Sequence, residues 1–185
     1  MKGVVFTEFL EMVEETFSAD LVDDIIEDSG VESGGAYTAV ATYDHAELVA
    51  LVLALSKRTE TPVPDLVRTF GRHLLGRFAV LFPDFFHVGS AFEFLQSIET
   101  HIHVEVKKLY PDAELPHFEC RQIGSKQLEM IYTSKRSFAD LAYGLIEGCG
   151  RHFGEDLLIH REDLVVEDGS QVRFLLTTQS AVAHG

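Results

Sequence analysis

Three polar side chains, Tyr132, Ser134 and Arg136, have the types and spacing of an anion-binding row. They continue an alternating pattern that begins at Leu128 and Met130. On a strand, residues two apart point to the same face, so a phenol, a hydroxyl and a guanidinium would project together. All three groups donate hydrogen bonds, and the fork of the guanidinium suits a carboxylate. The row therefore predicts a site for a ligand that carries carboxylates.

Two histidines upstream of this row, His101 and His103, could supply a metal ligand. On a strand both imidazoles would share a face, whereas on a helix they lie about 200° apart and cannot hold one ion together. The apolar stripe of residues 92–109 and the following Pro111 favour a helix. His103 would then point inward, because it lies one turn before Val106, while His101 would face solvent.

A single inward histidine is either a hydrogen-bonded core residue or a metal ligand, and its companions favour the ligand. Haem iron takes one axial imidazole. The two haem propionates are anionic and bind Arg, Tyr and Ser donors. The flat ring needs a wide apolar pocket. One histidine, a carboxylate-binding row and an apolar cavity together indicate a haem site.

The composition predicts one globular domain, residues 1–185, and argues against two classes of partner. Hydrophobic residues make up 46% of the chain and charged residues 24%, which suffices for one full core. The net charge is −15, with 30 acids against 15 bases. Such a surface repels nucleic acids and anionic membranes. The longest apolar stretch, residues 48–55, is too short to cross a bilayer, so no membrane insertion is expected.

The two cysteines, Cys120 and Cys149, have no spacing typical of a metal or redox motif. Two reduced thiols are typical of a cytosolic protein. The first residues do not form a secretory signal, because Glu8 and Glu11 interrupt the apolar run. We therefore expect a cytoplasmic protein.

Hydrophobic periodicity predicts helices in the first two-thirds of the chain and strands in the last third. Asp44 is suited to cap one of the helices, and Pro62 marks the start of the next. Residues 92–109 are predicted to form one continuous helix. The later segments are, in order, strands 118–122 and 127–132, helix 138–153, and strands 156–166 and 171–178. Helices followed by an antiparallel sheet that one helix crosses indicate an α+β domain, with haem bound between the two parts.

In their order and spacing, these residues resemble the H-NOX family, which binds nitric oxide or oxygen at haem and is related to the haem domain of soluble guanylate cyclase. The resemblance extends over nearly the whole chain and is closest to the bacterial stand-alone members. The residues that carry it are Met1-Lys2-Gly3, His103 with Tyr110-Pro111 seven positions later, Pro116, Tyr132-x-Ser134-x-Arg136, and Gly144-Leu145-Ile146-Glu147-Gly148.

The resemblance implies a haem b cofactor with His103 as its proximal iron ligand. Tyr132, Ser134 and Arg136 would bind the propionates, and Pro116 would press against the ring and distort it from planarity. Six apolar residues would line the gas-binding side, although ordinary core packing explains any one of them about as well. These six are Val5, Phe9, Leu74, Phe78, Leu141 and Leu145.

The gas-binding side also bears on which gas the family member binds. Oxygen on haem iron carries partial negative charge, which a hydrogen-bond donor stabilises by about 1.5–3 kcal/mol. Nitric oxide on ferrous haem is less polar and needs no donor. Oxygen-binding members place a tyrosine where this chain has Leu141, and Tyr143 would lie on another face of the helix. The resemblance therefore implies a nitric oxide sensor that also binds carbon monoxide and discriminates against oxygen.

In the family, nitric oxide weakens the iron–imidazole bond, so His103 would be released and residues 92–109 would shift. Carbon monoxide keeps the histidine bound and should signal less. Because the chain carries no output segment, the expected partner is a separate histidine kinase or a cyclic-di-GMP enzyme, a diguanylate cyclase or phosphodiesterase.

Three other interpretations remain open: an oxygen or redox sensor with the same haem, a haem carrier, and a haem enzyme. An enzyme would need a polar group beside the iron. The polar candidate nearby is His73, which we expect to face solvent, so the chain is predicted not to be an enzyme. Some relatives also hold structural zinc with cysteines, but Ala139 and Leu141 occupy those positions here, and no zinc is expected.

Overall fold

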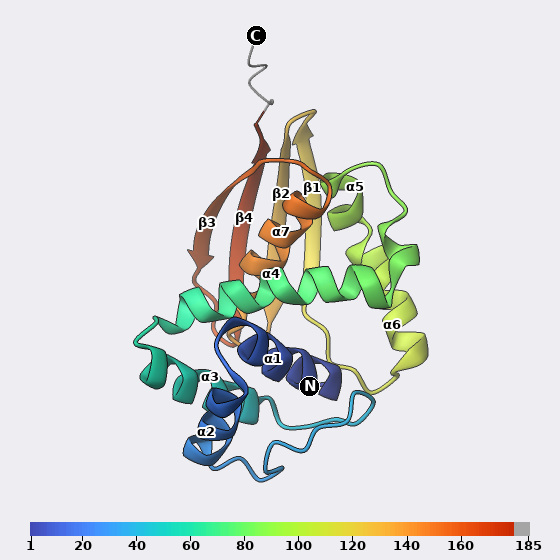
Figure 1. Cartoon of the computed structure of the whole chain (residues 1–185). Helices are drawn as coiled ribbons and strands as arrows, with labels where there is room; N and C mark the ends of the chain where they lie inside the picture. The colour runs from blue at the N-terminus through green and yellow to red at the C-terminus, as the bar shows by residue number, and fades with distance from the viewer. Residues whose placement is uncertain (180–185) are drawn as a thin grey trace.

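The computed structural model describes residues 1–179 and has a helical N-terminal part followed by an antiparallel sheet that one helix crosses (Figure 1). A 3-10 turn at Pro83–Phe86 and a π-helical turn at Ile98–Ile102 connect three of the helices. The elements are, in order, α1 (Gly3–Thr16), α2 (Ala19–Ser29), α3 (His45–Thr59), α4 (Val63–Leu81), α5 (Ala91–Gln96), α6 (His103–Leu109), β1 (His117–Gly124), β2 (Gln127–Ser134), α7 (Ala139–His152), β3 (Leu157–Leu164) and β4 (Ser170–Thr178).

Local side-chain signals define the helix ends. Ser18 accepts a hydrogen bond from the N–H of Leu21 at the start of α2, and Gly30 ends this helix with a φ of 60°. Asp44 caps α3 by accepting from the N–H of Ala46 at 2.9 Å, as its sequence position predicts. These caps satisfy backbone groups that have no partner inside a helix.

The four strands are arranged in the order β1-β2-β4-β3, and every neighbouring pair is antiparallel. Leu128, Met130 and Tyr132 of β2 alternate with more exposed residues and are at most 2% exposed. The register places Tyr132 between Phe118 of β1 and Val172 of β4. This buried face packs against α7, which crosses the sheet (Figure 1).

Two hydrophobic cores result, one between the sheet and α7 and one among α1 to α4. Helix α4 runs between the helical part and the sheet in Figure 1. Phe78 on α4 and Leu145 on α7 pack against both cores. The boundary between the two parts of the domain is therefore built from α4 and α7.

Helices α4 and α7 cross with their backbones in direct contact. A Cβ atom on Gly144 would lie 2.2 Å from the carbonyl oxygen of Arg68, and one on Gly71 would lie 2.6 Å from the carbonyl oxygen of Leu141. Real Cβ atoms do not approach so closely, so the crossing distance depends on glycine at both positions.

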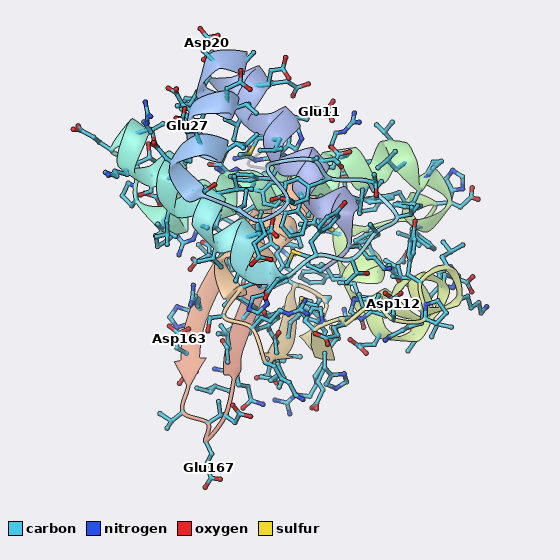
Figure 2. The ribbon with its side chains drawn as sticks, turned by 90° about the horizontal axis from the view of Figure 1, so that it is seen from below. Glu11, Asp20, Glu27, Asp112, Asp163 and Glu167 are labelled. Carbon is cyan, nitrogen blue, oxygen red and sulfur yellow. The ribbon has the colours of Figure 1, made fainter. Side chains whose placement is uncertain are left out.

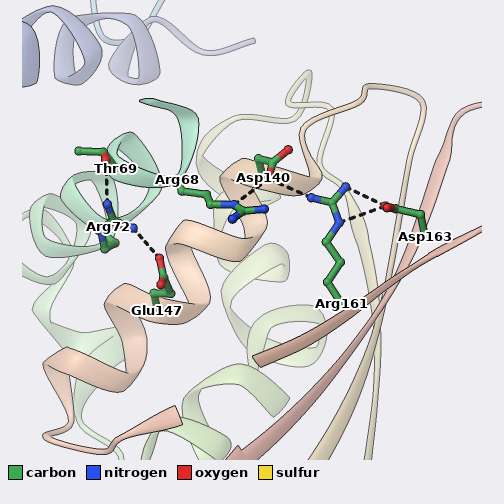
Figure 3. Close-up of polar contacts among 7 residues, drawn as sticks. All are labelled: Arg68, Thr69, Arg72, Asp140, Glu147, Arg161 and Asp163. Atoms are coloured by element: carbon green, nitrogen blue, oxygen red, sulfur yellow. Dashed lines mark hydrogen bonds and ion pairs between the residues drawn. The ribbon is translucent and has the colours of Figure 1, made fainter. Parts of the chain in front are cut away.

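Ion pairs flank this crossing on one side (Figure 3). Arg68 of α4 and Arg161 of β3 both bind Asp140 at the start of α7, with N···O distances of 2.8 and 2.9 Å. Further along the crossing, Arg72 binds Glu147 at 2.6 Å. The network ties α4 to both α7 and β3.

The structure confirms the predicted α+β class but corrects one element. Residues 92–109 do not form one continuous helix, because α5 ends at Gln96 and a π-helical turn separates it from α6.

Many acids lie at the surface: Figure 2 shows Glu11, Asp20 and Glu27 pointing outward from α1 and α2. Within residues 1–179, every helix is too short or too polar to span a bilayer.

The helix crossing predicts opposite effects for two glycine substitutions. Gly144→Ala should lower the free energy of unfolding by about 1–3 kcal/mol, because the new methyl group forces the two helices apart. Gly76→Ala is the matched control, since an added Cβ there meets nothing within 4 Å. That change should raise stability by about 0.5–1 kcal/mol through helix propensity. Urea unfolding measures both, and equal stability of the two variants would contradict the close crossing.

Candidate haem-binding site

His103 begins α6 directly after the π-helical turn Ile98–Ile102. Its N–H bonds the carbonyl of Ile98, five residues back, which is the spacing of a π-helix. The side chain is 17% exposed, and its ring centre lies 6.2 Å from that of Phe118 on β1. His101, by contrast, is exposed. His103 is therefore the histidine of the pair that turns toward the sheet.

The contacts of the His103 ring leave one nitrogen for a ligand. Nδ1 lies 2.9 Å from a carboxylate oxygen of Glu99, and because a carboxylate only accepts, Nδ1 carries the hydrogen of the neutral ring. Burial lowers the pKa of the imidazole, against the opposing effect of Glu99, and this favours the neutral form. Within residues 1–179, Nε2 has no hydrogen-bond partner, so its lone pair is the group that a metal would bind.

The predicted anion-binding row is brought together partly by β2 and partly by the turn after it. Strand β2 ends at Ser134, so Arg136 does not lie on the strand as the alternating pattern suggested. The Tyr132 hydroxyl donates to the Arg136 carbonyl at 3.2 Å, and the Arg136 N–H donates to the Ser134 hydroxyl at 3.1 Å. The Arg136 guanidinium pairs with the exposed carboxylate of Glu114. The three residues thus form one cluster, and its guanidinium already holds a carboxylate.

A line of rings connects this cluster to His103. The Phe118 ring lies 6.2 Å from the imidazole of His103 and 5.5 Å from the ring of Tyr132. Pro116 is half-buried and immediately precedes β1, in the loop that also carries Glu114. The predicted iron ligand, proline and propionate donors therefore gather around the start of β1 and the end of β2.

The six apolar residues predicted to face the gas come from α1, α4 and α7. All six belong to, or pack against, the core of the helical part. Phe9 and Leu74 are fully buried in this core. Four of the six pack in the helical core alone, whereas Phe78 and Leu145 also contact the core beneath the sheet, which includes Tyr132.

The tyrosine nearest to these residues in sequence points away from them. Leu141 packs against the helical core, whereas Tyr143 packs against Phe174 of the sheet and lies under the Arg68 guanidinium.

The expectation that His73 faces solvent is wrong. Its side chain is 17% exposed and its Nε2 lies 3.7 Å from a carboxylate oxygen of Glu8.

The residues present fit haem better than they fit an isolated metal ion. Across residues 1–179, no group of three or more His, Cys, Asp or Glu side chains could hold a metal ion. Haem needs only one imidazole from the protein, because the four porphyrin nitrogens already bind the iron. His103 offers such an imidazole, Arg136 offers a guanidinium in contact with a carboxylate, and the six apolar residues offer the nonpolar wall.

The fold and this site together describe a haem-based sensor domain, and comparison with known proteins agrees. Residues 2–161 match the model of the Haem-NO-binding family. The chain therefore belongs to this family, whose members are haem-binding gas-sensor domains and not enzymes.

Solved H-NOX structures match over nearly the full chain. The unliganded Fe(II) protein from K. algicida is 38% identical, with a TM-score of 0.90 and coverage of 100% of both chains. The Shewanella woodyi protein, solved with IWP-051 in the Fe(II)CO ligation state, is 39% identical, with a TM-score of 0.84 and coverage of 100% of this chain and 98% of that chain. The S. oneidensis protein in the Fe(II)NO state is 24% identical, with a TM-score of 0.89 and coverage of 97% of this chain and 100% of that chain, and it shows the fold alone. No curated protein matches the chain.

Sequence reasoning missed Glu99, the π-helical turn and Glu114. Glu99 lies four residues before His103, which is the spacing of neighbours on one helix face, so this pair could have been noticed. The sequence gives no sign of the π-helical turn, because residues 92–109 keep the apolar stripe of an ordinary helix. It gives no sign of the approach of Glu114 to Arg136 either, because that contact depends on the path of the loop before β1.

An open groove lies elsewhere, at the opposite ends of β1 and β2. Its volume is about 470 Å³, and it is lined mostly by polar residues of α5, the β1–β2 turn and the α7–β3 turn. A porphyrin ring needs an apolar pocket. The groove is therefore not part of the candidate haem site.

The two cysteines are expected to react slowly with thiol reagents. Burial raises the pKa of Cys120 from 9.0 to about 11, and burial also raises that of Cys149. A rise of two units makes the reactive thiolate about 100-fold scarcer at pH 8. Titration of the native protein with Ellman's reagent should show this slow reaction, and unfolding in guanidinium should abolish the delay. Rapid labelling of the native protein would contradict the burial of both thiols.

Proposed function

We propose that this chain senses nitric oxide through ferrous haem b held by His103, and that it also binds carbon monoxide. The observation that supports this most is the His103 imidazole, whose Nδ1 is occupied by Glu99 while Nε2 is left for iron. Membership of the Haem-NO-binding family supports the same ligand chemistry. The Fe(II)CO state of the Shewanella woodyi relative supports carbon monoxide as a second ligand.

In this proposal the haem lies at the boundary between the helical part and the sheet. Tyr132, Ser134 and Arg136 would hold the propionates, and Pro116 would press on the ring. A propionate could replace Glu114 on Arg136, since the Glu114 side chain is 77% exposed and would stay in solvent once displaced. On the gas side lie Val5, Phe9, Leu74, Phe78, Leu141 and Leu145.

Haem, when bound, would supply an iron that a diatomic gas can bind, and His103 would hold that iron through Nε2. His103 would be released when the gas is nitric oxide and would stay bound when the gas is carbon monoxide. Because His103 is the first residue of α6, its release would free that helix to shift. Such an element gives two states, whose populations a ligand changes only by its difference in affinity for them.

The proposal includes discrimination against oxygen. Tyr143 is turned to the sheet, and Leu141 occupies the helical side. The other phenols near the helical core are committed, Tyr37 to the Glu47 carboxylate and Tyr43 to backbone groups of the loop before α3. None of these three tyrosines is therefore available to donate a hydrogen bond to a negatively charged oxygen ligand.

The output of the sensor is proposed to be a separate protein, a histidine kinase or a diguanylate cyclase or phosphodiesterase. The shifting element in this proposal is α6, where Val104 and Leu109 are exposed. A partner that contacts α6 would experience the release of His103 directly.

His103→Ala tests the axial role. This variant should retain little haem after purification, and added imidazole should restore haem binding by replacing the lost side chain. His101→Ala is the matched control, because this exposed histidine lies on the same segment, and it should keep haem as the wild type does. Absorption spectra of the three ferrous proteins measure haem content. Wild-type haem content in His103→Ala without imidazole would exclude the proposed ligand.

Leu141→Tyr tests the choice of gas. The wild-type ferrous spectrum should change on addition of nitric oxide or carbon monoxide and should show no stable shift in air-saturated buffer. The new hydroxyl should increase oxygen affinity tenfold or more, since a charge-assisted hydrogen bond contributes about 1.5–3 kcal/mol. Oxygen titration followed by absorption provides the measurement. A wild-type protein that binds oxygen stably would show that Leu141 does not decide selectivity.

A further inference from the structure

The Glu99 carboxylate receives donors from two separate parts of the chain. Oε1 accepts from Nδ1 of His103 at 2.9 Å and from the backbone N–H of Phe118 at 2.8 Å. Oε2 lies 3.2 Å from Nδ1 of His117. His103 begins α6, whereas His117 and Phe118 begin β1. One carboxylate therefore joins the imidazole to the first strand of the sheet.

The backbone around Glu99 is specialised. The N–H groups of His101 and Ile102 both bond the carbonyl of Ser97, at 2.9 and 3.1 Å, within the π-helical turn. Such turns are rare and occur mostly at functional sites. Here the π-helical turn carries Glu99 and leads directly into His103. The backbone path of this turn therefore determines how the carboxylate is placed relative to the imidazole.

We propose that Glu99 is the positioning residue for the His103 imidazole, an inference that rests on the proposed axial role of His103. By accepting the Nδ1 hydrogen, the carboxylate selects the tautomer and directs the Nε2 lone pair. Because the acceptor is anionic, it also increases the electron donation of Nε2 to iron. The bond to the Phe118 N–H holds the carboxylate in place while it does so.

This arrangement has a consequence for signalling. A strongly donating imidazole resists release, so Glu99 sets how readily His103 leaves iron when nitric oxide binds. Once released, His103 moves either by breaking its bond to Glu99 or by pulling Glu99 away from Phe118. In the second case the movement reaches β1 as well as α6.

Glu99 could instead act only as a structural link between the π-helical turn and β1, and two variants separate these roles. Glu99→Gln keeps an oxygen acceptor for the Nδ1 hydrogen and the Phe118 N–H but removes the negative charge. Glu105→Gln is the matched control, because it removes a carboxylate from α6 that pairs with Lys108 at 2.6 Å.

The measurements are the iron–histidine stretching band in resonance Raman spectra of the ferrous, haem-loaded proteins, and the rate of haem transfer to apomyoglobin. We expect Glu99→Gln to lower the stretching frequency and Glu99→Ala to lower it further. Glu99→Ala should also speed haem transfer by about 10- to 100-fold, the usual effect of losing a group that orients a metal ligand. Glu105→Gln should change neither quantity. A purely structural link would leave the frequency of Glu99→Gln unchanged.

An unchanged frequency in Glu99→Gln, or an equal shift in Glu105→Gln, would overturn the role assigned to Glu99. Different results would contradict the proposed function itself. A wild-type protein without an iron–histidine band, or a His103→Ala variant that keeps the band, would remove His103 as the ligand. If the wild-type band is lost in His103→Ala but unaltered in Glu99→Gln, only the role proposed for Glu99 is contradicted.

Discussion

The close crossing of α4 and α7 is the constraint on which the rest of the molecule depends. Each helix gives one side to the helical core and another to the core beneath the sheet. Backbone contact at Gly71 and Gly144 leaves no room for adjustment by side chains, and packed interiors deform little. The crossing therefore fixes where the apolar residues of the helical part stand relative to β1 and β2.

At the boundary between the helical part and the sheet, few polar groups are placed to bind a ligand, and they belong to a strongly acidic chain. The net charge is −15, yet the cluster of Tyr132, Ser134 and Arg136 presents donors, and the Arg136 guanidinium already donates to the carboxylate of Glu114. At the start of α6, Nδ1 of His103 contacts Glu99, and among residues 1–179 its Nε2 has no hydrogen-bond partner. The two sites are linked through the Phe118 ring, so a ligand that spans them would touch both the start of α6 and the sheet.

Sequence patterns predicted the class of fold and the identity of the candidate residues, because these depend on local periodicity and on residue type. Alternation placed Leu128, Met130 and Tyr132 on the buried face of β2, and Asp44 capped α3 as expected. The patterns could not predict the π-helical turn, since residues 92–109 keep a helical apolar stripe through it. They also misplaced His73, whose packing against Glu8 depends on the contact between α1 and α4. The roles of the candidate residues in haem binding stay predictions.

The most direct test of the central claim is a crystal structure of the ferrous protein purified with its haem. The account predicts Nε2 of His103 bonded to iron, the propionates against Tyr132, Ser134 and Arg136, and the open face of the ring turned to the apolar residues of α1, α4 and α7. Iron held by another side chain, or a porphyrin bound away from the start of α6, would contradict it.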